Sequence, residues 1–287
     1  MLFYERENAG RMPGVSYCVT IRAETAIFVT SLDKLKNTWE GLAERDALSA
    51  ILTDDNRTGG RWNLAEFMAT GDAEIETVLN HLAKIGHAPD TSGVALDFGC
   101  GVGRLTQALA RRFSSCAGVD ISEHMIRQAE SLNQYPNCRY LASSAVRLPF
   151  ENASFHFIYS NIVLQHVPRQ LAVSYLREFV RLLAPGGVLV FGVQDSFAAP
   201  DLSSRMTRLR HIIHLRSRIR VALRRSSGDM QMHCLSERIV RCALGSVQIV
   251  DIQFTNTAAR DFNGRLVYLE QPPIAGYIGK QYCAVAK

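Results

Sequence analysis

The segment "ALDFGCGVGRLTQALA", residues 95–110, contains the most informative pattern in the sequence. A short apolar run ends at Asp97, glycines follow at positions 99, 101 and 103, and an apolar helical pattern resumes at once. In an open α/β sheet, a loop between a strand and a helix lies at the carboxyl end of the strand, where ligands bind. The segment therefore predicts a ligand-binding loop, and the question is whether its ligand carries phosphates.

Short apolar runs alternate with helical patterns on the C-terminal side of this loop. Helix-separated apolar strands of this length are typical of a mostly parallel sheet that is covered on both faces. The sequence therefore predicts an α/β fold with a doubly wound, mostly parallel seven-stranded sheet. The expected strands are residues 93–98, 116–120, 138–143, 154–160, 188–193, 246–254 and 282–287.

We expect one domain over residues 31–287, preceded by an irregular extension over residues 1–30. Ser31 and Asp72 are suited to begin two helices, because each precedes an apolar stripe at helical spacing. The expected parts of the domain are a helical cap (31–90), a ligand-binding core (91–195), an arginine-rich helical insertion after strand five (196–232), and a C-terminal helix with closing strands (233–287).

The composition indicates a globular protein that can bury a sizeable core. Of the 287 residues, 47% are hydrophobic and 21% are charged. The first thirty residues do not have the basic and apolar regions of a signal peptide, and no apolar run is long enough for a membrane helix. The seven cysteines are scattered, without a C-x-x-C pair. This arrangement makes both a disulfide framework and a structural zinc site unexpected, and it favours a reducing, cytoplasmic location.

The positive charge is concentrated in residues 203–225, which contain eight arginines and no acidic residue. Since the whole chain carries +5, the remainder carries 5 − 8 = −3, and a general affinity for nucleic acid does not follow. Three interpretations of the segment stay open. They are a solvated cationic face over a packed apolar stripe, a lid that meets an anionic acceptor, and, least favoured, peripheral contact with an anionic membrane or nucleic acid.

The glycine loop departs from the dinucleotide-binding pattern G-x-G-x-x-G. Arg104 occupies the position of the third glycine, whereas glycine stands one residue earlier, at Gly103. Asp97 precedes the loop, and a carboxylate there would repel phosphates but would suit a ligand with an ammonium group. An NAD-dependent oxidoreductase is therefore disfavoured.

These motifs resemble the class I S-adenosylmethionine-dependent methyltransferases, in particular bacterial small-molecule enzymes of the type 11 and type 25 families. In that family a strand ending in Asp or Glu is followed by G-x-G-x-G. The segments "GVDIS", "SSAVRLPF", "FIYSNIVLQHVP" and "LLAPGGVLVF" match further family motifs in the same order. The match covers residues 60–195 clearly and the flanks loosely. The resemblance implies a Rossmann-like methyltransferase fold and S-adenosylmethionine as the cofactor.

The resemblance also implies which residues bind the cofactor. The glycines and Asp97 match the positions that hold the methionine end, and Asp120 matches the acid that accepts the ribose hydroxyls. Ser144 stands where the family has an acid for the adenine amino group, which is a departure from the pattern. The complete expected set is Asp97, Gly99, Cys100, Gly101, Gly103, Asp120, Ile121, Ser144, Ala145 and Asn161. Phe67 and Gly71, from the segment before the loop, are candidate wall residues or ordinary packing residues.

Methyl transfer requires alignment of the acceptor and sometimes removal of one proton. His166 is the candidate general base, because histidine changes charge near neutral pH; the alternative is a structural role at the start of the next helix. Some relatives bind magnesium through E-x-x-E-H at this place. Here both acids are missing from Ile162-x-x-Gln165-His166, so no metal is predicted.

Two functions follow as expectations. The first is methyl transfer to a small-molecule O, N or C nucleophile by in-line displacement, with release of S-adenosylhomocysteine. The sequence contains no motif that identifies the acceptor, and specific recognition of nucleic acid is not expected. The alternative is a catalytically inactive methyltransferase-like domain that serves as a partner-binding subunit.

Overall fold

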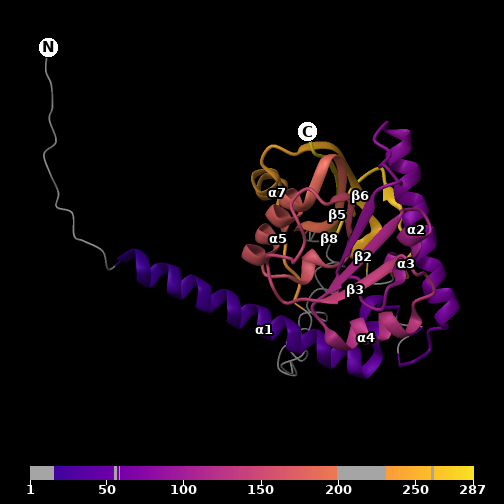
Figure 1. Cartoon of the computed structure of the whole chain (residues 1–287), viewed down its shortest axis with the longest axis horizontal. Helices are drawn as coiled ribbons and strands as arrows, with labels where there is room; N and C mark the ends of the chain where they lie inside the picture. The colour runs from indigo at the N-terminus through magenta and orange to yellow at the C-terminus, as the bar shows by residue number, and fades with distance from the viewer. Residues whose placement is uncertain (1–15, 55–56, 58, 199–230, 260–261) are drawn as a thin grey trace, which may run out of the picture.

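A computed structural model describes the backbone of residues 16–54, 57, 59–198, 231–259 and 262–287, with side chains from residue 31 onward (Figure 1). The arginine-rich segment 203–225 and the first 15 residues lie outside this description. The expectations for the insertion beyond residue 198 and for the extreme N-terminus therefore stay predictions.

The sheet of the described chain contains eight strands in the order β3-β2-β1-β4-β5-β8-β6-β7. The five strands from β3 to β5 are parallel, whereas β8 runs antiparallel to both of its neighbours, β5 and β6. The predicted mostly parallel sheet is thus confirmed, with one additional strand of two residues, β7, which is too short to leave a pattern in the sequence. The strands are β1 (Val94–Phe98), β2 (Ser115–Asp120), β3 (Cys138–Ala142), β4 (Phe155–Ser160), β5 (Leu183–Ala198), β6 (Gln248–Thr255), β7 (Tyr268–Leu269) and β8 (Gly276–Val285).

Two of the expected helix starts are wrong. The first helix begins at Ser16, because no glycine or proline interrupts residues 16–31, so residues 16–30 are helical rather than irregular. The second begins at Leu64, since the side chain of Asn63 caps it, and Asp72 lies in its interior. The described helices are α1 (Ser16–Ile51), α2 (Leu64–Lys84), α3 (Arg104–Ala110), α4 (Glu123–Leu132), α5 (Arg169–Leu182) and α7 (Glu237–Leu244), with short 3₁₀ turns η1 (Leu164–His166) and η2 (Asn256–Ala258).

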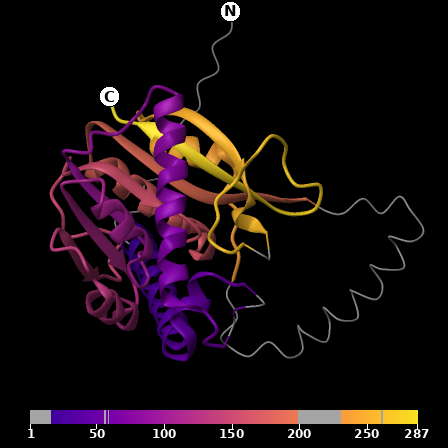
Figure 2. The same ribbon diagram turned by 90° about the vertical axis from the view of Figure 1, so that its right-hand side faces the viewer.

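The helices cover both faces of the sheet, as the apolar runs of the strands require. On one face, α2 and α3 pack against the sheet through Ile75, Val78 and Leu109, which are fully buried. On the other face, α5 and α7 pack through Phe179 and Val240. Figure 2 shows α2 crossing the sheet in front of the strands. Every central strand is therefore buried on both sides, and the polar strand ends are left as the place for a site.

The C-terminal part of α1 closes one end of the domain. The helix bends at Asp46, whose φ and ψ are −166° and 88°, and the Asp46 carboxylate caps the following turn at Ser49. Beyond this bend, α1 packs on a third apolar cluster that includes Trp62, Phe67 and Met125. In Figure 1 the first turns of α1 extend away from the body of the molecule. Within the described chain, every helix is too short or too polar to span a bilayer.

Candidate functional site

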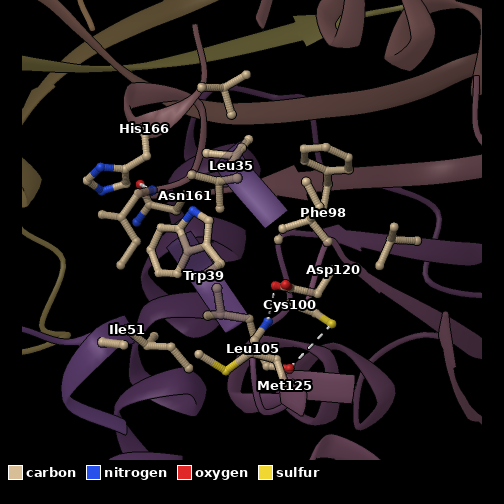
Figure 3. A pocket seen from close by; sticks show the side chains of 18 of the residues that line it. Leu35, Trp39, Ile51, Phe98, Cys100, Leu105, Asp120, Met125, Asn161 and His166 are labelled. Atoms are coloured by element: carbon tan, nitrogen blue, oxygen red, sulfur yellow. Dashed lines mark hydrogen bonds between the residues drawn. The ribbon is translucent and has the colours of Figure 1, made fainter. Parts of the chain in front are cut away.

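A pocket opens at the carboxyl ends of β1, β2 and β4, where the sequence predicted a ligand-binding loop. The space between its lining residues is about 900 Å³ when the part open to solvent at the mouth is included. In Figure 3, Trp39 and Leu35 face Phe98 and Asp120 across it, and His166 lies at one end. Of the predicted site residues, those that line it are Gly99, Cys100, Gly101, Asp120, Ile121, Asn161 and His166.

Asp120 is the last residue of β2 and is held firmly by the backbone around it. One carboxylate oxygen accepts a hydrogen bond from the Gly101 N–H at 2.9 Å, and the other accepts one from the Ser122 N–H at 2.9 Å. Burial raises the pKa of Asp120, although these backbone N–H groups oppose the change. A carboxylate has about four acceptor positions. Two positions therefore stay available, which suits a ligand with a pair of hydroxyl groups.

The glycines of the loop are required by the conformation of the backbone itself. Gly99 and Gly101 have φ values of +79° and +53°, a region that side chains rarely adopt. A Cβ atom at Gly99 would lie 2.3 Å from Val163, and one at Gly101 would lie 2.5 Å from Ile51. The side chains of Val163 and Ile51 therefore occupy the space beside these glycines. The sequence predicted that the glycines allow a ligand to come close, and the structure adds a second reason, which is the packing of these two side chains.

Asp97 lies beneath the loop rather than on the pocket wall, with a relative exposure of 1%. Its Oδ2 accepts a hydrogen bond from the Thr106 hydroxyl at 2.7 Å, whereas Oδ1 has no partner among the described residues. Burial raises the pKa of Asp97 to about 7, and the Thr106 hydroxyl and Arg104 oppose this rise. A buried acceptor without a partner is costly. It is therefore a place where a donor from a ligand, directly or through water, would be stabilising.

A buried polar network supports the pocket from the side of α2. Glu74, which is fully buried, accepts hydrogen bonds from Arg104 at 2.8 Å, from the Asn161 amide at 2.8 Å and from the Tyr159 hydroxyl at 2.8 Å. Arg104 and Asn161 both line the pocket. One carboxylate on α2 therefore orients side chains from the glycine loop and from the end of β4.

The turn after β4 has an unusual backbone conformation next to this network. Ile162 has φ of +53°, which is rare for a β-branched residue and costs about 1–3 kcal/mol. The Asn161 Oδ1 accepts a hydrogen bond from the Ile162 N–H at 3.1 Å and so stabilises the turn. Ile162 thereby becomes part of the pocket wall. Such outliers are concentrated at functional sites.

His166 lines the pocket, and both of its ring nitrogens have partners. Nε2 lies 3.2 Å from the Gln165 amide nitrogen, and Nδ1 lies 3.2 Å from the carbonyl oxygen of Gln231. Because an amide nitrogen only donates, Nε2 accepts and Nδ1 carries the proton. Burial lowers the pKa of His166 to about 4, so the ring is neutral at neutral pH. Trp39 packs edge-on against it at 5.6 Å.

Several predicted residues lie away from the pocket. Ser144 and Ala145 are exposed and do not line it. Ser143 does, because its N–H binds the Asp120 carbonyl oxygen at 2.9 Å and thus brings this residue to the mouth. Phe67 packs in the apolar cluster with Trp62 and Met125, Gly71 lies against Arg104, and Gly103 lies against the Tyr140 ring.

The contribution of α1 to the pocket was not predicted from the sequence. Leu35, Trp39 and Ile51 all line it, from the helix that was expected only to cap the domain. The sequence signal was the apolar stripe containing Leu35 and Trp39, which in a single sequence cannot be told from core packing. Glu74 was not predicted either, because its partner Arg104 is 30 residues away in the sequence.

Comparison with known proteins assigns a family to this fold. Residues 96–191 match the family described as "Methyltransferase domain". These residues contain the end of β1, the glycine loop, Asp120 and β4. The chain therefore contains a class I methyltransferase domain. The methyltransferase domain comprises the parallel half of the sheet, and the pocket lies at its carboxyl edge.

The relatives of this methyltransferase domain are small-molecule enzymes by name. The chain is 31% identical over 141 residues to a trans-aconitate 2-methyltransferase of Methylobacterium radiotolerans, covering 48% of this chain and 52% of that protein. It is 36% identical over 100 residues to a demethylmenaquinone methyltransferase of Staphylococcus aureus, covering 33% and 41%. The chain thus spans about half the length of these relatives or less.

The fold is shared with solved methyltransferase structures. Phosphoethanolamine N-methyltransferase 1 of Haemonchus contortus, solved with phosphoethanolamine and S-adenosylhomocysteine, matches with a TM-score of 0.57 and 16% identity. The match covers 89% of this chain and 49% of that one. At this identity the likeness concerns the fold, and it extends beyond the methyltransferase domain to most of the described elements.

Proposed function

We propose that this protein transfers a methyl group from S-adenosylmethionine to a small-molecule nucleophile and releases S-adenosylhomocysteine. The observation that carries the proposal is the position of Asp120, at the end of β2 in the pocket wall, with two acceptor positions left by its backbone partners. The family match over residues 96–191 and the names of the relatives support it.

The residues present fit this cofactor. Asp120 would accept the two ribose hydroxyls, Ile121 would lie against the adenine, and Ser143 replaces Ser144 as the polar residue near the base. Asp97 has an unpaired buried oxygen, which fits the ammonium of the methionine end. When bound, the cofactor supplies a methyl group on a sulfonium whose leaving group departs neutral.

The chain's own contribution is to bind, orient and exclude water. Asn161 is fixed by Glu74, and Trp39 and Ile162 form apolar walls beside it. His166 is neutral, and its Nε2 could take a proton from the substrate only after it loses the hydrogen bond that Gln165 donates. This arrangement favours a role for His166 in orienting the substrate rather than as a strong base.

The acceptor class is a small molecule with an apolar or aromatic body. The apolar side chains of Leu35, Trp39 and Ile162 line the pocket, and Leu35 and Trp39 lie across it from Asp120 (Figure 3). The relatives named for trans-aconitate and demethylmenaquinone support a small-molecule acceptor, although these names do not distinguish a polar acceptor from an apolar one.

Calorimetry with S-adenosylmethionine, beside an assay for S-adenosylhomocysteine release with phenols, amines and carboxylic acids, tests the proposal. We expect saturable one-site binding and turnover with at least one acceptor class. Absence of binding, or preferential binding of NAD, would overturn the cofactor assignment. Tight binding with no turnover on any class would favour the partner-binding alternative.

A further inference from the structure

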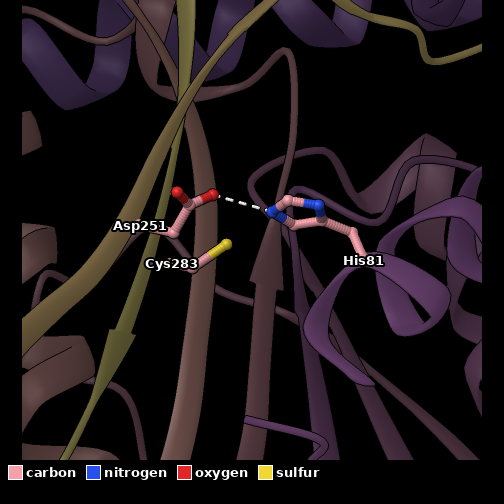
Figure 4. A group of neighbouring side chains, drawn as sticks. All are labelled: His81, Asp251 and Cys283. Atoms are coloured by element: carbon pink, nitrogen blue, oxygen red, sulfur yellow. Dashed lines mark hydrogen bonds and ion pairs between the residues drawn. The ribbon is translucent and has the colours of Figure 1, made fainter. Parts of the chain in front are cut away.

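A group of three metal-ligating side chains lies outside the pocket, on the sheet face that α2 covers (Figure 4). His81 comes from α2, Asp251 from β6 and Cys283 from β8. Their imidazole, carboxylate and thiol ligand atoms all lie within 4.8 Å of one another. Asp251 and Cys283 are paired across the two strands, and Figure 4 shows both side chains directed toward the His81 ring. Within the described part of the chain, it is the only group of this kind.

We propose that His81, Asp251 and Cys283 bind a zinc ion. Zinc prefers this mixture of nitrogen, oxygen and sulfur ligands, and sites with three protein ligands complete their tetrahedron with water. The charges also balance, because a thiolate and a carboxylate together offset the two positive charges of the ion. A neutral site matters at this depth, since an unbalanced charge is costly to bury.

The side chains around the ligands hold them in place. The Tyr268 ring packs against the His81 ring at 4.6 Å, and the Gln253 amide donates to both oxygens of Asp251, at 3.0 and 3.1 Å. Such outer partners orient metal ligands. The side chains of His81 and Asp251 are 14% and 21% exposed, whereas Cys283 is buried. Solvent therefore reaches the site past the partly exposed His81 and Asp251 side chains.

Metal binding changes the protonation of Cys283 and the hydrogen bond between His81 and Asp251. His81 Nε2 now lies 2.7 Å from Asp251 Oδ2. As the sulfur–zinc bond forms, the thiol proton passes to solvent. The His81 ring binds through Nε2 with its proton on Nδ1, and the Asp251 oxygen exchanges its hydrogen bond for the metal.

The ion would join α2 to two C-terminal strands, residues far apart in the sequence. Because it would bind only where these elements are packed together, it should stabilise the folded chain. None of its ligands lines the pocket. The zinc site is therefore expected to act on stability and to leave cofactor binding unchanged, so its test is independent of the proposed function.

Cobalt(II) alone, added to the reduced, untagged full chain, is the probe that tests the site. We expect thiolate-to-cobalt charge-transfer absorption at one equivalent, removed by competing zinc, and a rise in melting temperature with zinc. Cys283→Ser should abolish the charge-transfer absorption. Cys242→Ser, which alters an exposed cysteine, is the matched control and should retain it.

A second variant tests the site without altering the buried Cys283, whose replacement by serine could prevent folding. His81→Asn changes a side chain near the surface and should weaken cobalt binding by about tenfold or more, with an unchanged circular dichroism spectrum. Absence of a charge-transfer band in the wild-type chain would overturn the proposal. So would a band that persists in Cys283→Ser, or cobalt affinity unchanged in His81→Asn.

Discussion

At the scale of single residues, Asp97 connects the protonation of a buried carboxyl with cofactor binding. Its pKa is raised to about 7, chiefly by burial, whereas an unfolded chain would have about 3.9. The folded state thus favours the protonated form, and the resulting stability is present below the unfolded pKa and lost as pH rises through about 7. An ammonium of the cofactor, in contrast, pairs with the ionised form.

The affinity for S-adenosylmethionine should therefore rise as pH increases through about 7, because more Asp97 is ionised before binding. Calorimetry across this range measures it. Asp97→Asn keeps an acceptor for Thr106 but carries no charge, so it should bind more weakly and with little pH dependence. An equally steep pH profile in this variant would assign the titration to another group.

Glu74 makes a prediction about stability. Glu74→Ala should lower the free energy of unfolding by about 3–5 kcal/mol, because it leaves the Arg104 guanidinium buried without its partner. Urea denaturation measures the change. Glu76→Ala, on the exposed side of the same helix, is the control and should be nearly neutral. A loss below about 1 kcal/mol for Glu74→Ala would contradict a buried ion pair of this strength.

How much of the site the sequence predicts depends on whether a residue lies in a local motif. Asp120, Ile121 and the glycine loop lie within motifs of a few residues, and the structure places them at the pocket. Ser144 lies outside the pocket and Ser143, one position earlier, lines it, because a loop after a strand does not fix which side chain turns inward. His81, Asp251 and Cys283 are distant in the sequence, and only the fold brings them together.

At the scale of elements, the contact between α1 and α4 positions one wall of the pocket. The Glu40 carboxylate accepts hydrogen bonds from the Ser122 hydroxyl at 3.0 Å and from the N–H groups of Glu123 and His124 at 2.6 and 3.2 Å. It thus caps the N-terminus of α4, where negative charge is stabilising. Trp39, the adjacent residue of α1, lines the pocket.

Glu40→Ala should therefore destabilise the protein by about 1–2 kcal/mol, a magnitude typical of a lost helix cap. Chemical denaturation gives the free energy, and faster hydrogen exchange in α1 would show that the contact has loosened. Glu44→Ala changes an exposed acid one turn along the helix and serves as the control. Equal effects from the two variants would argue against a specific cap.

The sequence predicts elements well where their ends carry local signals. Ser122 caps α4, since its hydroxyl accepts a hydrogen bond from the Met125 N–H. The starts of α1 and α2 were wrong, because several residues in each segment could serve as caps and only tertiary packing selects among them. The two-residue β7 exists through pairing with β6 and has no pattern of its own.

At the scale of the whole molecule, the sheet places the two acids of the proposed cofactor site at neighbouring strand ends. Asp97 is in β1 and Asp120 ends β2, and the strands pair in parallel with Phe98 opposite Val119. The alternation of apolar strands and helices in the sequence predicts this arrangement. The antiparallel insertion of β8 between β5 and β6 could not be predicted from periodicity, because strand order depends on pairing between distant segments.

The central claim is that Asp120 holds the ribose of S-adenosylmethionine, and calorimetric titration of Asp120→Ala with S-adenosylhomocysteine tests it most directly. Loss of two hydrogen bonds to a charged acceptor should weaken binding by about 2–3 kcal/mol, or roughly 30- to 150-fold. Glu130→Ala, on the exposed face of α4, is the control and should bind as the wild type does. Unchanged affinity in Asp120→Ala would contradict the claim.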